Sequence, residues 1–101
     1  MPTTVYTLLC QNDRTGYVLA VFTDRAHAAK VARANAATHA ERLRRQDEKT
    51  FKAPVADDVY QVHVEDLGSN LTFFIRHRFL DEAETYRWLV HEFEIVPPAL
   101  K

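Results

Sequence analysis

The segment from Tyr17 to Gln46 constrains the fold most, because it joins an apolar run to a long alanine-rich stretch. The run Val18–Phe22 contains only apolar residues and has the length and composition of a β-strand. Thr23 and Asp24 follow it, and either side chain can accept a hydrogen bond from the free amides of a first helical turn. We therefore predict a strand that leads directly into a helix, which runs to about Gln46.

The predicted helix presents a narrow face made mostly of alanine. At helical periodicity this stripe contains Ala29, Ala32, Ala36, Ala40 and Leu43, flanked by Ala28, His39 and Arg33. Such a stripe lets a helix approach a sheet closely, but it buries little apolar area per residue. Most of the apolar burial must then come from the strands.

Other segments of the chain have the composition of strands: Thr4–Gln11, Val59–Leu67, Leu71–Leu80 and Tyr86–Val96. Turn residues separate them at 12–16, 66–70 and 81–85, and the polar stretch 47–58, with Pro54, predicts a connecting loop. Consecutive strands joined by short turns usually pair as neighbours. We predict an α+β fold of order ββαβββ. Residues 1–101 form a single domain, in which one long helix packs on one face of a mostly antiparallel five-stranded sheet.

Length, composition and charge exclude several classes of protein. The 101 residues are 47% hydrophobic and 27% charged, with a net charge of −1. This charge supplies no overall attraction to nucleic acid or anionic lipid, and no apolar run approaches the ~20 residues that a membrane helix needs. Cys10 has no partner for an internal disulfide and no signal-sequence pattern opens the chain, so we expect a cytoplasmic protein.

The sheet carries more apolar side chains than one helix can cover. Several predicted strands are apolar on both faces, and the last strand sets Tyr86, Trp88 and Val90 opposite Leu89, His91, Phe93 and Ile95. Whichever set meets the helix leaves the other uncovered. A large uncovered apolar patch usually marks a partner surface, so we predict a homodimer through a sheet face that includes Phe74, Tyr86, Trp88 and Val90. The alternatives are that the fourth or fifth strand twists, or that the loop 47–58 folds back and covers this face with Phe51, Pro54 and Val55.

The helix also carries a basic surface formed by Arg33, Arg42, Arg44 and Arg45. Phosphate binding needs basic residues gathered along one face, and aromatic residues assist by stacking on bases. At helical periodicity these arginines point in different directions, and no aromatic residue interrupts them. A solvated helix face explains the same residues, so nucleic-acid binding remains an alternative with weaker support.

No motif for catalysis, metal binding or nucleotide binding is present in the sequence. The only glycines, Gly16 and Gly68, lie in predicted turns and exclude glycine-rich phosphate loops. His63, His77 and His91 lack the ligand spacing of a zinc site, and Cys10 lies in an apolar strand typical of a buried thiol. We predict no catalytic residues, metal ligands or cofactors. A small enzyme that uses these histidines or Cys10 at a dimer seam is a further alternative.

These observations favour a non-enzymatic protein-binding module, such as a regulator or inhibitor of a larger complex, acting as a homodimer. The chain resembles many small bacterial and phage proteins in having a hairpin that ends in Val21–Asp24 before an alanine-rich helix and a closing segment Phe93–Ile95. We transfer no function from that likeness. The sequence leaves the identity of the partner open.

Overall fold

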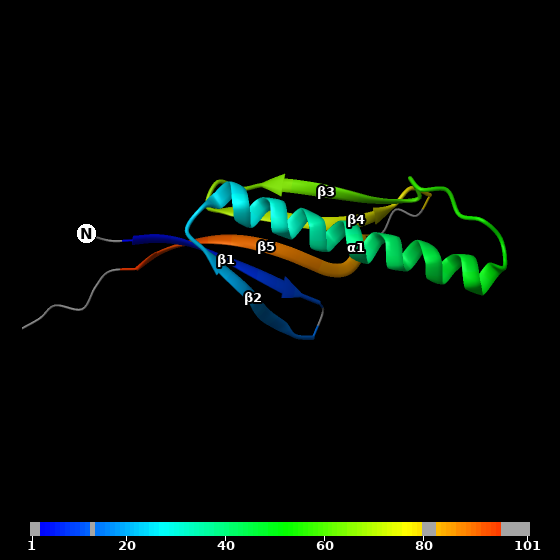
Figure 1. Ribbon diagram of the computed structural model, residues 1–101, viewed down its shortest axis with the longest axis horizontal. Helices are drawn as coiled ribbons and strands as arrows, with labels where there is room; N and C mark the ends of the chain where they lie inside the picture. Colours follow the sequence, from blue (N-terminus) through cyan, green and yellow to red (C-terminus); the bar gives the residue numbers. More distant parts are fainter. Residues whose placement is uncertain (1–2, 13, 80–82, 96–101) are drawn as a thin grey trace, which may run out of the picture.

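A computed structural model describes residues 3–12, 14–79 and 83–95 of the chain. It contains five strands and one helix in the predicted order ββαβββ, and every strand pair is antiparallel. The sheet order is β2-β1-β5-β4-β3, with the helix on one face, which confirms the predicted α+β fold (Figure 1). The elements are β1 (Thr3–Gln11), β2 (Gly16–Phe22), α1 (Arg25–Phe51), β3 (Tyr60–Asp66), β4 (Asn70–His77) and β5 (Ala83–Ile95).

The helix begins where the sequence predicts and ends later. Asp24 is the N-cap: its backbone is extended and its carboxylate accepts a hydrogen bond from the Ala26 amide. The predicted end at Gln46 is wrong, because α1 continues to Phe51 and Lys52 ends it in the left-handed conformation. The polar residues between Gln46 and Lys52 include neither glycine nor proline, so nothing in them breaks the helix.

The core lies between the alanine stripe of α1 and one face of the sheet, which we call the helix-covered face. Ala28, Ala32, Ala36 and Ala40 are buried, whereas the predicted stripe members Ala29 and Leu43 pack at its margin. The small alanines bring the helix backbone close to large side chains of the sheet. These sheet residues are Leu8, Cys10, Leu71, Phe73, Ile75, Trp88 and Val90.

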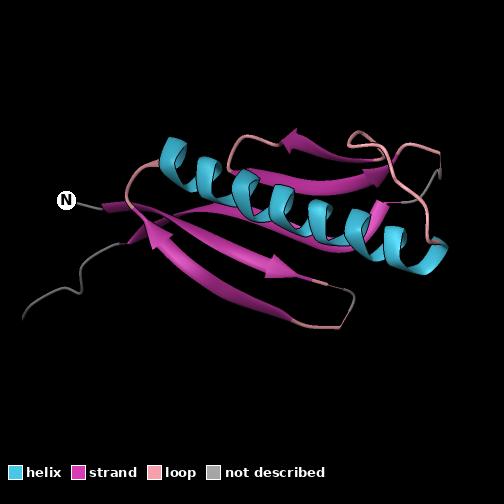
Figure 2. Cartoon of the chain, turned by 45° about the vertical axis from the view of Figure 1, so that its right-hand side comes forward, coloured by secondary structure: helices cyan, strands magenta, loops and turns pink. Residues whose placement is uncertain are grey.

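The β1–β2 hairpin lies to one side of the helix, and α1 runs mainly over β3, β4 and β5 (Figure 2). A bulge interrupts the hairpin: Leu8 pairs with Ala20 and Leu9 with Val18, so Leu19 is an extra residue in β2. Bulges increase local twist and redirect side chains. The tip is closed by the Asn12 side chain, which accepts hydrogen bonds from the amides of Arg14 and Thr15.

The other strands differ from the prediction mainly at their ends. β3 and β4 are shorter than predicted, and the predicted strand ends at Leu80 and Val96 lie outside the described residues. The predicted turn 81–85 is wrong in its second half, because β5 already begins at Ala83; residues 81 and 82 are not described. Gly68 adopts positive φ in the turn between β3 and β4, as a tight turn requires.

The segment between α1 and β3 does not cover the second face of the sheet. It crosses from the end of the helix to β3, where the Val55 carbonyl accepts a hydrogen bond from Arg44 of the helix and Val59 is buried (Figure 1). Phe51, which would have to supply much of the cover, is 71% exposed. The alternative in which this loop folds back over the sheet is therefore wrong.

Candidate functional site

The face of the sheet that turns away from α1 carries exposed apolar side chains on adjacent strands. On β2, Val18 is 54% and Val21 60% exposed, and on β5 Phe93 is 46% and Ile95 53% exposed. We call this side of the sheet the open face. Its apolar members, including half-buried ones, are Val5, Leu9, Val18, Val21, Phe74, Leu89, Phe93 and Ile95.

Strand register brings these side chains into rows across the sheet. Leu9 of β1 lies between Val18 of β2 and Leu89 of β5, and Val5 of β1 is directly opposite Phe93 of β5. Side chains directly opposite one another on antiparallel strands are close enough to touch. The apolar residues of β2, β1 and β5 therefore form an apolar patch in which Thr7 and His91 lie between the two rows, beside Val21. A single helix on the other side of the sheet cannot shield this patch.

The β4–β3 half of the open face is more polar. Phe74 stacks on the His63 ring with centroids 5.7 Å apart, and its β5 neighbour is Arg87. Asn70 hydrogen-bonds with His91, and Glu65 lies opposite Thr72. Polar and charged side chains thus border the apolar patch along one side, as they do at the rim of protein interfaces.

The structure corrects the predicted membership of the partner surface. Trp88 is 4% and Val90 2% exposed, and both belong to the core beneath α1. Tyr86 packs against the same core, with its ring 4.7 Å from that of His39 on the helix. Of the four predicted residues, only Phe74 lies on the open face, where it is half-buried. The prediction placed the wrong set of β5 side chains on the uncovered side.

A size argument could have identified the set that faces the helix. A face of alanines leaves space that large side chains must fill, and Trp88 is the largest side chain in β5. The residues that sequence reasoning missed are Val18 and Val21 on β2 and Phe93 and Ile95 on β5. Once Trp88 is assigned to the helix side, strand alternation assigns Phe93 and Ile95 to the open face.

The predicted basic surface is divided by local ion pairs. The Arg44 side chain is 17% exposed and lies within ion-pair distance of Glu41, Glu48 and Asp57. Hydrogen bonds from Arg44 and then Arg45 hold the pKa of Glu41 at about 2, against a usual 4.5. The bond with Glu41 likewise raises the pKa of Arg44. Arg44 and Arg45 therefore form a charge-paired cluster with acidic neighbours.

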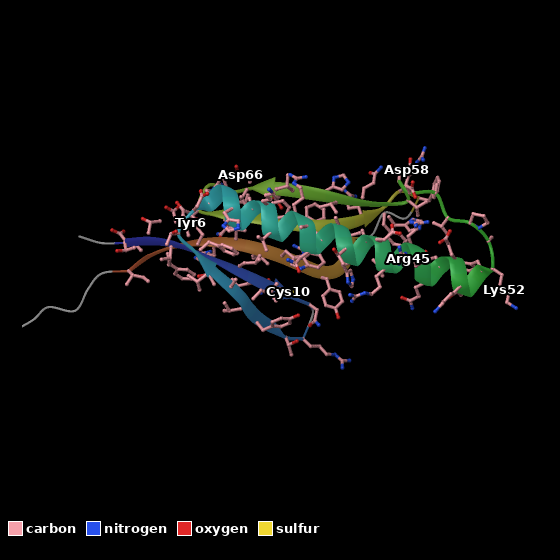
Figure 3. All side chains as sticks on the ribbon, viewed as in Figure 1. Tyr6, Cys10, Arg45, Lys52, Asp58 and Asp66 are labelled. Carbon is pink, nitrogen blue, oxygen red and sulfur yellow. The ribbon has the colours of Figure 1, made fainter. Side chains whose placement is uncertain are left out.

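The other two predicted basic residues have different surroundings. The Arg33 guanidinium lies over the Phe73 ring, 5.4 Å from its centroid. Arg42 is exposed, and within the described part of the chain no hydrogen bond or ion pair is found for it. Arg45 and Lys52 lie toward the C-terminal end of α1, at the opposite end of the molecule from Tyr6 and Asp66 (Figure 3). The four arginines do not form one continuous basic face.

The candidate catalytic and metal-binding side chains do not converge. His91 contacts Asn70, whereas His77 lies at the other end of β4 against Tyr60, with ring centroids 5.0 Å apart. His63 stacks on Phe74 on the open face, and Cys10 is buried on the helix-covered face. Among residues 3–12, 14–79 and 83–95, no group of three or more His, Cys, Asp or Glu side chains could hold a metal ion.

No protein-family model, curated protein or solved structure matches this chain. In the described residues, no helix is long and apolar enough to cross a membrane. Functional inference therefore depends on the surfaces of the molecule itself.

Proposed function

We propose that this protein is a non-enzymatic protein-binding module that associates with a second copy of itself through the open face. The observation that carries the proposal is the exposed apolar patch on β2, β1 and β5. Its exposed members Val18, Val21, Phe93 and Ile95 lie on two strands that flank β1. Patches of this kind on soluble proteins usually mark interaction sites, and twofold self-association is the commonest form.

The arrangement of the open face is consistent with a twofold contact between sheets. Two copies that pack patch against patch bury the apolar side chains of β2, β1 and β5 in the centre. Polar side chains such as Glu65 of β3 and Arg87 of β5 then lie at the rim. Regulation or inhibition of a larger complex is a role that such a dimer can perform, and we retain it as part of the proposal.

Nucleic-acid binding has less support. Arg44 and Arg45 share Glu41, and Arg33 lies against Phe73, so part of the basic charge is already engaged within the chain. A phosphate backbone would have to compete with these internal partners. An enzyme built on Cys10 and the histidines has less support still, because those side chains lie on different faces and at different ends of the sheet.

Light scattering on a sizing column tests the proposed dimer. The mass of the native protein is expected to be twice that of one chain and to fall to one chain on dilution. Phe93→Glu places a charge within the patch and is expected to yield the monomer at all concentrations used. A native protein that stays monomeric at high concentration would contradict the proposal.

A matched control separates the patch from general effects of added charge. Phe79 is 72% exposed, lies outside the five strands and is absent from the open face, so Phe79→Glu makes the same substitution elsewhere. This variant is expected to keep the mass of the native dimer. Equal dissociation by both variants would mean that net charge, and not the open face, controls association.

A further inference from the structure

A cavity of about 410 Å³ lies between α1 and the β1–β2 hairpin, on the side of the sheet opposite the open face. Ala34, Thr38 and Arg42 of the helix form one wall, and Tyr17 and Leu19 of the hairpin form another. Small-molecule sites typically enclose ~300–1,000 Å³ and combine aromatic walls with a few polar groups. The cavity has the size of such a site, and its lining combines aromatic rings with polar groups.

The shape of the hairpin creates this space. The bulge adds Leu19 to β2, and this side chain lines the cavity together with Tyr17 and Cys10. Because α1 runs mainly over β3, β4 and β5, the helix side of the hairpin is only partly covered, and Tyr17 is 58% exposed. A side-chain hydrogen bond and a charge interaction with Cys10 raise the pKa of Tyr17.

Aromatic rings form the floor of the cavity. Tyr86 and Trp88 of β5 stack at a centroid distance of 6.4 Å and an interplanar angle of 28°. The His39 ring packs against both of them, at 4.7 Å from Tyr86 and 5.6 Å from Trp88. Flat aromatic groups pack favourably against such rings, in stacked or edge-to-face arrangements.

Arg42 supplies a positive charge at this cavity that its neighbours on the helix do not neutralise. It is the only Arg, Lys, Asp or Glu among the described residues that line the cavity. The nearby carboxylate of Glu41 is occupied by Arg44 and Arg45, which leaves the Arg42 guanidinium available to a ligand. A guanidinium presents paired N–H groups that match the two oxygens of a carboxylate.

We propose that this cavity is a binding site for a small aromatic carboxylate. The aromatic ring of the ligand packs against the floor formed by Tyr86 and Trp88, and its carboxylate pairs with Arg42. This site does not rest on the proposed dimer, because it lies on the opposite side of the sheet and shares no residue with the apolar patch. Failure of one proposal therefore leaves the other unaffected.

Trp88 makes binding directly measurable, because it is the only tryptophan in the chain and it lines the cavity. Phenylacetate, the probe, absorbs at shorter wavelengths than indole, so tryptophan can be excited selectively during a titration. We expect a saturable change in Trp88 fluorescence with phenylacetate. Phenylacetamide, which has the same shape without the charge, is expected to bind at least about tenfold more weakly, since it loses a charge-assisted pair.

Two arginine variants with the same change in charge test the role assigned to Arg42. Arg42→Gln is expected to weaken phenylacetate binding by at least about tenfold and to abolish the preference for the acid over the amide. The Arg45 side chain pairs with Glu41 and does not line this cavity. Arg45→Gln is therefore expected to bind phenylacetate with an affinity within about twofold of that of the native protein. Both positions are exposed, so neither change is expected to affect folding.

Three results would overturn the proposal. The first is the absence of a saturable fluorescence change with phenylacetate in the native protein. The second is equal affinity for phenylacetate and phenylacetamide, and the third is equal loss of affinity in Arg42→Gln and Arg45→Gln. Ala34→Phe, which fills the cavity from the helix side, provides an additional check: its circular dichroism spectrum should match that of the native protein while the fluorescence response disappears.

Discussion

Both faces of the sheet carry apolar side chains, but the helix covers only one of them. The helix-covered face places large side chains such as Phe73 and Trp88 against a stripe of alanines, and these residues are almost fully buried. The open face carries Val18, Val21 and Phe93, and none of the described helices or strands lies above them. The burial of an apolar strand residue in this fold therefore depends on whether the helix covers its face of the sheet.

This difference gives the two faces separate roles. Packing on the helix-covered face stabilises the isolated chain, because its side chains leave water when the helix docks. The open face can contribute comparable stabilisation only after another surface covers it. Substitutions that are matched across the two faces test this distinction.

The largest change in the free energy of unfolding is expected when a phenylalanine is truncated on each face in turn. Phe73 is 1% exposed and Phe93 46% exposed. Phe73→Ala is expected to lower the free energy of unfolding by about 3–5 kcal/mol, because it removes buried area and leaves a cavity. Phe93→Ala is expected to cost less than about 1 kcal/mol in urea unfolding of dilute, monomeric protein. Equal costs would show that the open face is already covered in the monomer.

The alanine stripe can be tested by enlarging one of its members. Ala36 is buried against the sheet, so Ala36→Leu is expected to push the helix away and to cost about 1–3 kcal/mol of stability in urea unfolding. Ala37 is exposed on the same helix, and Ala37→Leu is expected to change stability by less than about 0.5 kcal/mol. Tolerance of leucine at Ala36 would mean that the helix does not pack closely on the sheet.

Removal of the N-cap of the helix is expected to have a smaller effect on stability. Asp24→Ala removes the carboxylate that accepts from the Ala26 amide and is expected to cost about 1 kcal/mol in thermal or urea unfolding. Thr23→Ala is the control, since Asp24 and not Thr23 occupies the cap position. A larger loss from Thr23→Ala would indicate that the cap lies one residue earlier.

The smallest effect is expected on the pH dependence of unfolding, through Glu41 on the helix. The pKa of Glu41 is about 2 in the folded chain and its usual value is 4.5, so folding favours the charged carboxylate. Its contribution to stability is complete above the usual value and is lost as pH falls from about 4.5 toward 2. Glu41→Gln is expected to flatten the pH dependence of unfolding over this interval. An unchanged pH profile would mean that Glu41 is not paired in solution.

The sequence predicts the architecture well because its signals are local. The apolar run Val18–Phe22, the cap at Asp24 and the alanine periodicity together define the strand-to-helix junction. The end of the helix is harder to predict, because the polar stretch 47–51 has the composition of a helix surface as well as that of a loop. The stretch 47–51 is helical because it continues the preceding turns of the helix, and its composition alone does not decide between helix and loop.

The composition of the open face depends on information that alternation alone does not contain. A strand with apolar residues on both sides allows two orientations, and Trp88 can face the helix or solvent with the same pattern. The bulge in β2 cannot be predicted from the alternation of the sequence either, because it depends on how Leu8 and Leu9 of β1 pair with β2. Likewise, the ion pair between Arg44 and Asp57 exists only because the chain turns back after the helix.

The order of the strands also indicates where aggregation of the protein is expected to begin. β2 and β3 form the two margins of the sheet, where backbone amides and carbonyls face outward. β3 carries Glu65 and Asp66, and charged residues on an edge strand discourage further strands from joining it. β2 has no ionisable residue except Tyr17, so we expect fibrillar aggregation of concentrated or partly unfolded protein to start along β2. A lysine at an outward position of β2 is the corresponding remedy.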